Sequence, residues 1–181
     1  MTNNAALIQL NCSGNQLIFL DVSQNTTLTD LVCNTNQLTS LNISQNTALT
    51  DLACVDNQLT SLDLSNNAAL TYLEFQTNQL TTLDVSQNTN LTFLNCINNQ
   101  LTSLDVSNNT DLTYLTCRFN QLTSLDVSQN NSLTALDCIN NQLINLDVRN
   151  GNNTNFNIFY STFNSDLICI FVDDADWSAT N

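Results

Sequence analysis

Cysteine is the most reactive residue type in this sequence, and its spacing limits the chemistry that it can perform. Six of the seven cysteines recur at intervals of 21 residues or twice that: Cys12, Cys33, Cys54, Cys96, Cys117 and Cys138. Phe75 fills the gap in this series. A position that accepts phenylalanine is an apolar packing position, where a free cysteine behaves as a small hydrophobic side chain, and parallel side chains in stacked repeats disfavour disulfide bonds. We therefore predict buried free thiols, with Cys169 left over and buried as well.

The other residue types used in catalysis and metal binding are scarce. The chain has no histidine, no C-x-x-C pair and a single glutamate, Glu74. Zinc sites and Ser-His or Cys-His nucleophiles therefore have no candidates, and acid–base catalysis would depend on aspartate pairs. We predict a protein that is not an enzyme and that needs no cofactor.

Aspartate recurs at the same 21-residue interval and offers a second kind of chemistry. The column contains six members, with Asn42 as an interruption: Asp21, Asp63, Asp84, Asp105, Asp126 and Asp147. Carboxylates stacked about 4.8 Å apart repel one another by roughly 1 kcal/mol per pair in water. One interpretation is a calcium-binding ladder on Asp63, Asp84, Asp105 and Asp126, because calcium prefers several oxygen ligands. The other interpretation is structural, with each carboxylate accepting hydrogen bonds from flanking serine and threonine hydroxyls.

These columns depend on a 21-residue period that leucines mark without insertion or deletion: Leu7, Leu28, Leu49, Leu70, Leu91, Leu112 and Leu133. We take each of these leucines as position 1 of a coil. A fixed period of this size predicts a solenoid. Alternation of inward and outward residues in 31–33 and 41–43 predicts one short strand in each half of the coil. Successive coils then form two narrow parallel sheets that face each other and wind right-handed.

Both halves of a coil share one pattern, L-x-x-L-x-[C/V/I]-x-x-N, as in residues 28–36 and 38–46. This pattern resembles the leucine-rich repeat family, and within it the nested bacterial type of surface or secreted proteins, Bacteroidetes-like in character. The resemblance covers residues 7–150 and implies an all-β-rich, right-handed leucine-rich repeat solenoid of seven coils. The asparagines fall where the chain turns, so we expect their side chains to bond turn backbone groups in ladders along the stack.

The period predicts a single domain whose two ends differ from its middle. Residues 1–150 form the solenoid, in which residues 1–6 align with 22–27 and are the end of a truncated coil. After Val148 the period breaks, and residues 149–155 read as a turn. Residues 151–181 then form a degenerate eighth coil and C-terminal cap, as is typical of terminal repeats. Its larger inward residues and its turn asparagine are the following: Phe156, Phe159, Asn164, Leu167 and Ile170.

Charge and hydropathy exclude two classes of partner. Sixteen acidic residues stand against two arginines and no lysine, which gives a formal net charge of −14. Such a chain repels nucleic acids and anionic membrane surfaces. No apolar run approaches the roughly 20 residues that cross a bilayer, so we predict no membrane insertion.

Outward residues of the first half-coil vary from coil to coil, whereas those of the second half repeat Thr and Ser. Positions 3, 5 and 7 of coils four to six form the candidate ligand-binding patch: Tyr72, Glu74, Gln76, Phe93, Asn95, Ile97, Tyr114, Thr116 and Arg118. Exposed aromatic residues beside an arginine are typical of protein-binding hot spots, and aromatic faces also receive sugar rings. The alternative is cross-strand aromatic pairing that only stabilises the sheet.

These observations predict a non-catalytic recognition or adhesion module that binds a protein ligand at a cell surface through this patch. A polysaccharide-binding module using the same aromatic column is the first alternative, and a structural spacer with no ligand of its own is the second. The resemblance to surface-associated bacterial leucine-rich repeat proteins implies an extracellular or cell-surface location.

Overall fold

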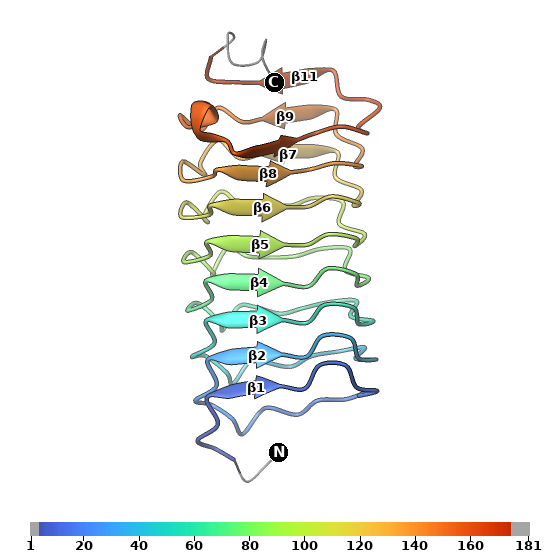
Figure 1. The fold of residues 1–181 in the computed structure, drawn as a ribbon, viewed down its shortest axis with the longest axis vertical. Coiled ribbons are helices and arrows are strands. Elements are labelled where there is room, and N and C mark those ends of the chain that lie inside the picture. Colours follow the sequence, from blue (N-terminus) through green and yellow to red (C-terminus); the bar gives the residue numbers. More distant parts are fainter. Residues whose placement is uncertain (1–3, 175–181) are drawn as a thin grey trace.

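The computed structural model describes residues 4–174, which form a solenoid of stacked coils (Figure 1). The first half-coils build an eight-stranded parallel sheet in the order β1-β2-β3-β4-β5-β6-β8-β10. Its strands are β1 (Gln9–Asn11), β2 (Asp30–Val32), β3 (Asp51–Ala53), β4 (Tyr72–Glu74), β5 (Phe93–Asn95), β6 (Tyr114–Thr116), β8 (Ala135–Asp137) and β10 (Ile158–Tyr160). From β1 to β8 each residue pairs with the residue 21 positions further along the chain. The predicted parallel solenoid is confirmed.

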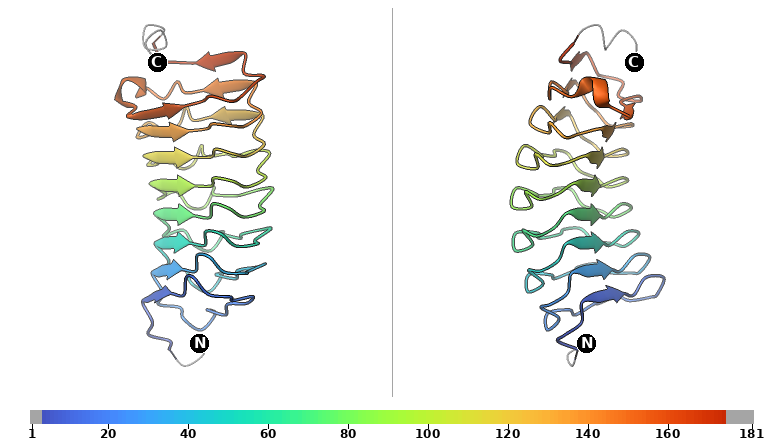
Figure 2. Two further views of the ribbon diagram at one scale, coloured as in Figure 1. Left: turned by 45° about the vertical axis from the view of Figure 1, so that its right-hand side comes forward. Right: turned by 60° about the vertical axis from the view of Figure 1, so that its left-hand side comes forward.

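The second sheet is shorter than the sequence predicts. It contains β7 (Ser124–Asp126), β9 (Asn145–Asp147) and β11 (Cys169–Phe171), whose direction is opposite to that of the first sheet (Figures 1 and 2). In coils one to five, the described second halves form no strand ladder. They are joined by an isolated bridge between Asp21 and Asn42 and by single backbone hydrogen bonds, such as that from the N–H of Gln58 to the carbonyl of Leu38 at 2.9 Å. The prediction of one strand in every half-coil is therefore wrong there. Grooves lined by serine and aspartate lie along the second half-coils.

The core is a continuous column of side chains contributed by both halves of every coil. In coil four the side chains of Leu70, Leu73, Phe75, Leu80 and Val85 are all fully buried. The same positions are buried in the neighbouring coils, where leucine, valine, isoleucine and cysteine occupy them. Burial of a leucine side chain stabilises a fold by about 2 kcal/mol, so every coil adds a similar increment and depends on its neighbours for it.

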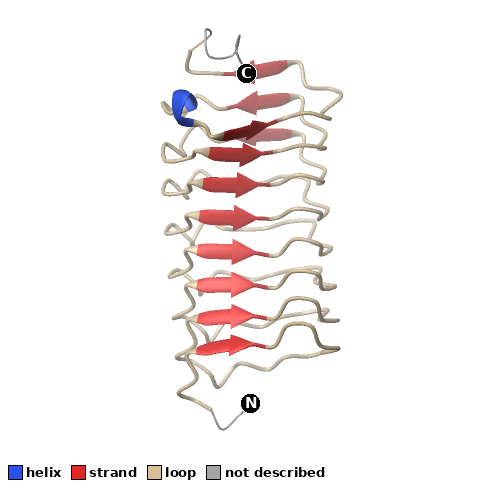
Figure 3. Ribbon diagram, viewed as in Figure 1, coloured by secondary structure: helices blue, strands red, loops and turns tan. Residues whose placement is uncertain are grey.

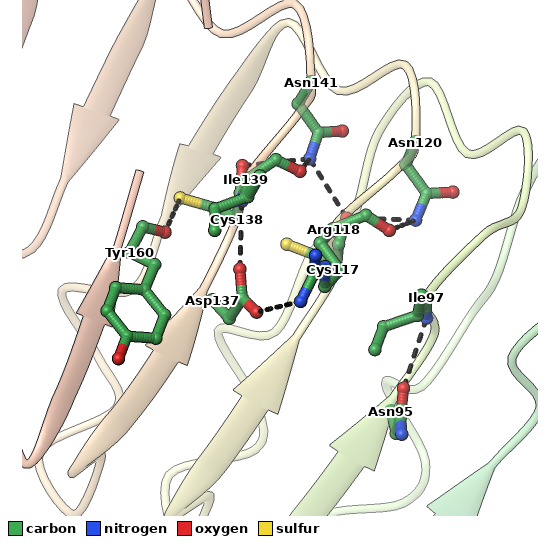
Figure 4. A network of polar contacts seen from close by, with 10 residues as sticks. All are labelled: Asn95, Ile97, Cys117, Arg118, Asn120, Asp137, Cys138, Ile139, Asn141 and Tyr160. Atoms are coloured by element: carbon green, nitrogen blue, oxygen red, sulfur yellow. Dashed lines mark hydrogen bonds and ion pairs between the residues drawn. The ribbon is translucent and has the colours of Figure 1, made fainter. Parts of the chain in front are cut away.

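A ladder of asparagine side chains at position 9 joins each coil to the one before it. The Nδ2 group of Asn120 donates to the backbone carbonyl of Cys117, in its own coil (Figure 4), and to that of Cys96, in the preceding coil. Its Oδ1 accepts the backbone N–H of Leu101 at 3.0 Å. The residue before it, Phe119, has a φ of 56°, and position 8 is left-handed in every coil. The predicted asparagine ladder is confirmed.

A second asparagine ladder, at position 19, ties the coils together where strands are missing. Asn88 is fully buried, and its Nδ2 group donates to the carbonyls of Leu64 at 3.2 Å and Asn67 at 2.8 Å. Both acceptors belong to the preceding coil. These side-chain bonds replace some of the inter-coil bonds that a continuous second sheet would supply.

The eighth coil departs from the period, as predicted, and closes one end of the core. A short 3-10 helix, η1 (Asn153–Asn155), lengthens the connection that enters it (Figure 3), and β10 pairs with β8 at an offset of 23 residues. Phe156 and Phe159 pack against the core, and Asn164 continues the position 9 ladder. Cys169 is only half buried, so the prediction of its burial is wrong; it lies in β11, an edge strand of the second sheet. The last seven residues of the predicted cap, 175–181, and residues 1–3 lie outside the described part.

Candidate recognition face

Three aromatic side chains stack on the outward surface of the eight-stranded sheet, which we call the first face. Tyr72 on β4, Phe93 on β5 and Tyr114 on β6 are strand partners in register. The centroids of Tyr72 and Phe93 are 4.4 Å apart with 11° between the ring planes, and those of Phe93 and Tyr114 are 4.5 Å apart with 6°. All three side chains are partly exposed. The parallel register thus turns one variable column of the sequence into one aromatic stack.

The stacking decides which parts of the rings a ligand can reach. Each ring covers its neighbour, so Phe93 presents an edge to solvent and hides both of its faces. The uncovered faces belong to Tyr72, toward β3, and to Tyr114, toward β8. Since sugar rings bind to aromatic faces, the column offers them little area, whereas protein side chains also pack against ring edges. The stack is at the same time a cross-strand arrangement that stabilises the sheet.

The position 5 column of the patch is less accessible than the sequence suggests. The exposed fractions of Asn95 and Thr116 are 8% and 1%, because the larger side chains of positions 3 and 7 flank them. Asn95 Oδ1 accepts the backbone N–H of Ile97 at 3.3 Å and so shapes the end of its strand. Glu74 remains partly exposed. The expectation of exposed position 5 contacts is therefore wrong for Asn95 and Thr116 and fits Glu74.

The position 7 column contributes Arg118 to the patch, and this side chain has contacts within the chain. Arg118 Nη1 lies 3.5 Å from Asp137 Oδ2, and its guanidinium carbon lies 4.8 Å from the ring centroid of Phe119. Figure 4 shows this ion pair between neighbouring strands, beside Ile97 and Asn95 of the preceding coil. Gln76 and Ile97 are partly buried in the same column. A ligand at the first face therefore meets Arg118 as part of a partly exposed ion pair.

Acidic groups dominate the electrostatics of the first face. Burial raises the pKa of the Tyr72 hydroxyl well above its usual value, and a hydrogen bond to Glu74 and the charges of Glu74 and Asp51 add to this. Burial also raises the pKa of Tyr114, with further contributions from the charges of Asp137 and Glu74. Both hydroxyls therefore stay protonated at neutral pH and act as donors in a negative field.

The first face also contains aromatic residues that the sequence analysis missed. Tyr160 on β10 pairs in register with Asp137 and is 53% exposed. Phe119 and Phe163 occupy left-handed turn positions and are 40% and 78% exposed. The 23-residue offset of the eighth coil concealed the register of Tyr160. For the two phenylalanines, the available signal was an aromatic residue at a turn position that glycine, asparagine, aspartate or threonine occupies in the other coils.

The aspartate column lies on the opposite surface, formed by the second half-coils, which we call the second face. Asp84 Oδ1 accepts the backbone N–H of Ser86 at 2.9 Å, and the same bond recurs along the column. Hydrogen bonds from serine, first from its hydroxyl, lower the pKa of Asp63 and Asp84. Within residues 4–174 no three acidic, cysteine or histidine side chains converge in a metal-binding group. The serine hydrogen bonds are those that the structural interpretation of the aspartates predicts.

A groove runs across the second face between coils four and six. Its volume is about 580 Å³, and its lining includes Asp84, Asp105, Asp126, Ser86 and Ser107. Each of these aspartates already accepts a backbone amide in its own turn. The groove is therefore a regular feature of the repeat, in contrast to the first face, where each coil differs from the next.

The cysteine column lies inside the solenoid and forms no disulfide. Five of its members are buried, as predicted, whereas Cys12 is half buried, so the prediction of burial is wrong for this residue of the first coil. Burial raises the pKa of Cys33 and of Cys96 to about 12. Phe75 is fully buried in the same column. Thiols of this kind are unreactive at neutral pH, which agrees with the predicted packing role.

Comparisons with known proteins connect this geometry to leucine-rich repeat proteins. InlJ from Listeria monocytogenes, whose functional domain includes a cysteine ladder, is 36% identical over 91% of this chain and superposes with a TM-score of 0.64. A leucine-rich repeat protein of Leptospira interrogans is 25% identical over 97% of the chain, with a TM-score of 0.81. An internalin (inlF) of Listeria monocytogenes, 24% identical over 96% of the chain with a TM-score of 0.67, shares the fold. No protein-family model and no curated protein sequence matches.

The comparisons identify the fold as that of leucine-rich repeat proteins, which are typically interaction modules without catalytic activity. The chain spans about half the length of these proteins, 46% of the first two and 49% of the third. No helix in the described part of the chain is long and apolar enough to cross a membrane.

Proposed function

We propose that this chain is a non-catalytic recognition module of an extracellular or cell-surface protein and binds a protein partner through its first face. The observation that carries the proposal is the partly exposed stack of Tyr72, Phe93 and Tyr114 at the centre of a face whose residues differ from coil to coil. A structural surface gains nothing from such variation, whereas a recognition surface requires it. The likeness to leucine-rich repeat proteins supports a protein-interaction role.

The rigidity of the solenoid supports recognition energetically. Strand pairing, two asparagine ladders and a continuous core fix the backbone beneath the stack before any ligand arrives. Side chains that are already ordered lose little conformational entropy on binding, so more of the contact energy appears as affinity. Aromatic side chains in such a setting are the residues that dominate protein interfaces.

The two alternatives are separated from this proposal by the geometry and by experiment. A glycan would need ring faces, and the stack covers both faces of Phe93 and one face of each tyrosine. Carbohydrate binding is therefore the weaker interpretation. A pure spacer would have no ligand for either face.

The proposal is tested by comparing the two faces of the purified domain. A variant with Phe93→Ala and Tyr114→Ala alters the first face, and a matched variant with Thr102→Ala and Ser103→Ala alters exposed residues of the second half-coil. We expect capture of a protein from cell-surface extracts by the native domain and by the second variant, but not by the first. Both variants must melt cooperatively, which circular dichroism checks. Equal capture of the protein by both variants would refute the assignment of the binding site to the first face. Binding on a glycan array without any protein capture would favour the carbohydrate module. Binding in neither assay would favour the spacer.

A further inference from the structure

The aromatic stack ends on its β3 side with an uncovered ring face. Phe93 covers one face of Tyr72. The other face is on the side of β3, the second neighbour of β4, where the strand partner of Tyr72 is Asp51 and the partner of Glu74 is Ala53. Asp51 and Ala53 are both much smaller than a ring, so the height of the first face drops by one step between β4 and β3. The step is bounded by one aromatic face and by carboxylates.

Within residues 4–174 the carboxylates at this step form no ion pair. Asp51 is in register with Asp30 on β2, and like charges opposite one another destabilise a sheet. Thr50 Oγ1 donates to Asp51 Oδ2 at 2.7 Å, which leaves the other carboxylate oxygen available. The two arginines of the chain are engaged elsewhere, Arg118 with Asp137 and Arg149 with Asp147.

We propose that the step between β3 and β4 binds a lysine or arginine side chain of the protein partner, with its cationic group on the free face of Tyr72 and between the carboxylates of Asp51 and Glu74. This inference rests on the proposed function and adds the chemistry of the partner, which presents a basic segment to the first face. A cation within about 6 Å of a ring centroid is attracted by the ring, and a guanidinium also pairs with carboxylates.

The charge of the whole domain favours the same partner. With a net charge of −14, the domain attracts basic proteins over long distances and accelerates their association, an effect that salt weakens. Burial first, and then Glu74 and Asp51, raise the pKa of the Tyr72 hydroxyl, in agreement with two carboxylates close to this side chain. An acidic segment would be repelled there, and a neutral one would leave the carboxylates uncompensated.

The experiment uses a short basic peptide and its uncharged twin as probes. Ac-Gly-Arg-Gly-Arg-Gly-amide is titrated into the isotope-labelled domain, and the same peptide with citrulline in place of arginine serves as the control, because citrulline keeps the shape and removes the charge. We expect the arginine peptide to shift the amide signals of β3 and β4 in two-dimensional NMR spectra and the citrulline peptide to leave them nearly unchanged.

Isosteric variants locate the interaction. Asp51→Asn and Glu74→Gln remove one charge each at the step without changing size, and we expect each to weaken binding of the arginine peptide roughly threefold to tenfold. Tyr72→Leu removes the ring and is expected to weaken it comparably. Asp63→Asn removes the same charge from the second face and is expected to change affinity less than twofold.

Three results would overturn the inference: equal shifts with the citrulline peptide, shifts that spread over the second face, or equal weakening by Asp63→Asn and Asp51→Asn. Its failure is distinguishable from failure of the proposed function. If the arginine peptide does not bind at the step but protein capture still depends on Phe93 and Tyr114, the first face remains the recognition surface. In that case only the inference of a basic partner is wrong.

Discussion

Replacement of Asn120 by alanine tests how much each coil depends on its asparagine ladder. The Asn120 side chain accepts the N–H of Leu101 at 3.0 Å and donates to the carbonyls of Cys96 at 2.9 Å and Cys117 at 3.0 Å. Both carbonyls retain a second asparagine donor, from Asn99 and Asn141 respectively, whereas the Leu101 N–H loses the partner that it has. One orphaned buried donor together with two lost bonds amounts to about 3 kcal/mol.

The measurement is equilibrium unfolding in urea followed by circular dichroism. Asn108→Ala is the matched control, because Asn108 is exposed and its one bond, to the carbonyl of Ser86, is long at 3.4 Å. We expect the Asn120 variant to lose about 3 kcal/mol of unfolding free energy and the control to lose less than about 0.5 kcal/mol. If the slope of the unfolding free energy against urea concentration is unchanged, the whole solenoid still unfolds as a unit. Equal, small losses in both variants would refute the view that the ladder holds the coils together.

Three further predictions concern thiols, turns and acidity. In the native protein a maleimide reagent should modify Cys12 and Cys169, which are half buried, and mass spectrometry should find the other five thiols modified only after unfolding. Thr35 is a β-branched residue with a φ of 52°, so Thr35→Asn should raise the unfolding free energy by about 1 kcal/mol in urea, and a loss would contradict the strain argument. Hydrogen bonds from Ser86 lower the pKa of Asp84, so this carboxylate contributes stability above its unfolded pKa that is lost as the pH falls through the folded value. Ser86→Ala should raise the Asp84 pKa measured by NMR titration, and an unchanged value would show that the hydroxyl is not the cause.

The interior of the solenoid could be predicted from the sequence because the same few contacts recur in every coil. Leu73 and Phe75 are buried where the alternation placed them, and Asn120 bonds turn carbonyls as its position predicted. A repeat gives each inward position several independent examples, so one tolerated substitution, such as phenylalanine among cysteines, identifies the environment. The parallel register then follows from the period without further information.

The outward surface could be predicted less well because it depends on neighbours that differ from coil to coil. Thr116 was expected to be exposed, but flanking side chains of positions 3 and 7 bury it. The sequence analysis missed Tyr160 because an inserted turn, η1, shifts its register by two residues. The second sheet was overestimated because alternation indicates which way side chains point and does not indicate whether neighbouring backbones form a ladder.

The inward side chains hold the solenoid together, and this explains why the outward residues of the first face can vary. Inward leucines, cysteines and two asparagine columns hold the backbone in every coil, whereas the contacts of the outward residues at positions 3, 5 and 7 differ from coil to coil. A stack such as Tyr72, Phe93 and Tyr114 can therefore arise in three coils while Asp30 and Asp51 occupy the same column in two others. The resulting boundary between aromatic and acidic coils is a feature of this chain and not of the repeat. A ligand that recognises it must match both an apolar ring edge and a row of negative charge, which is the combination that a basic segment of a protein supplies.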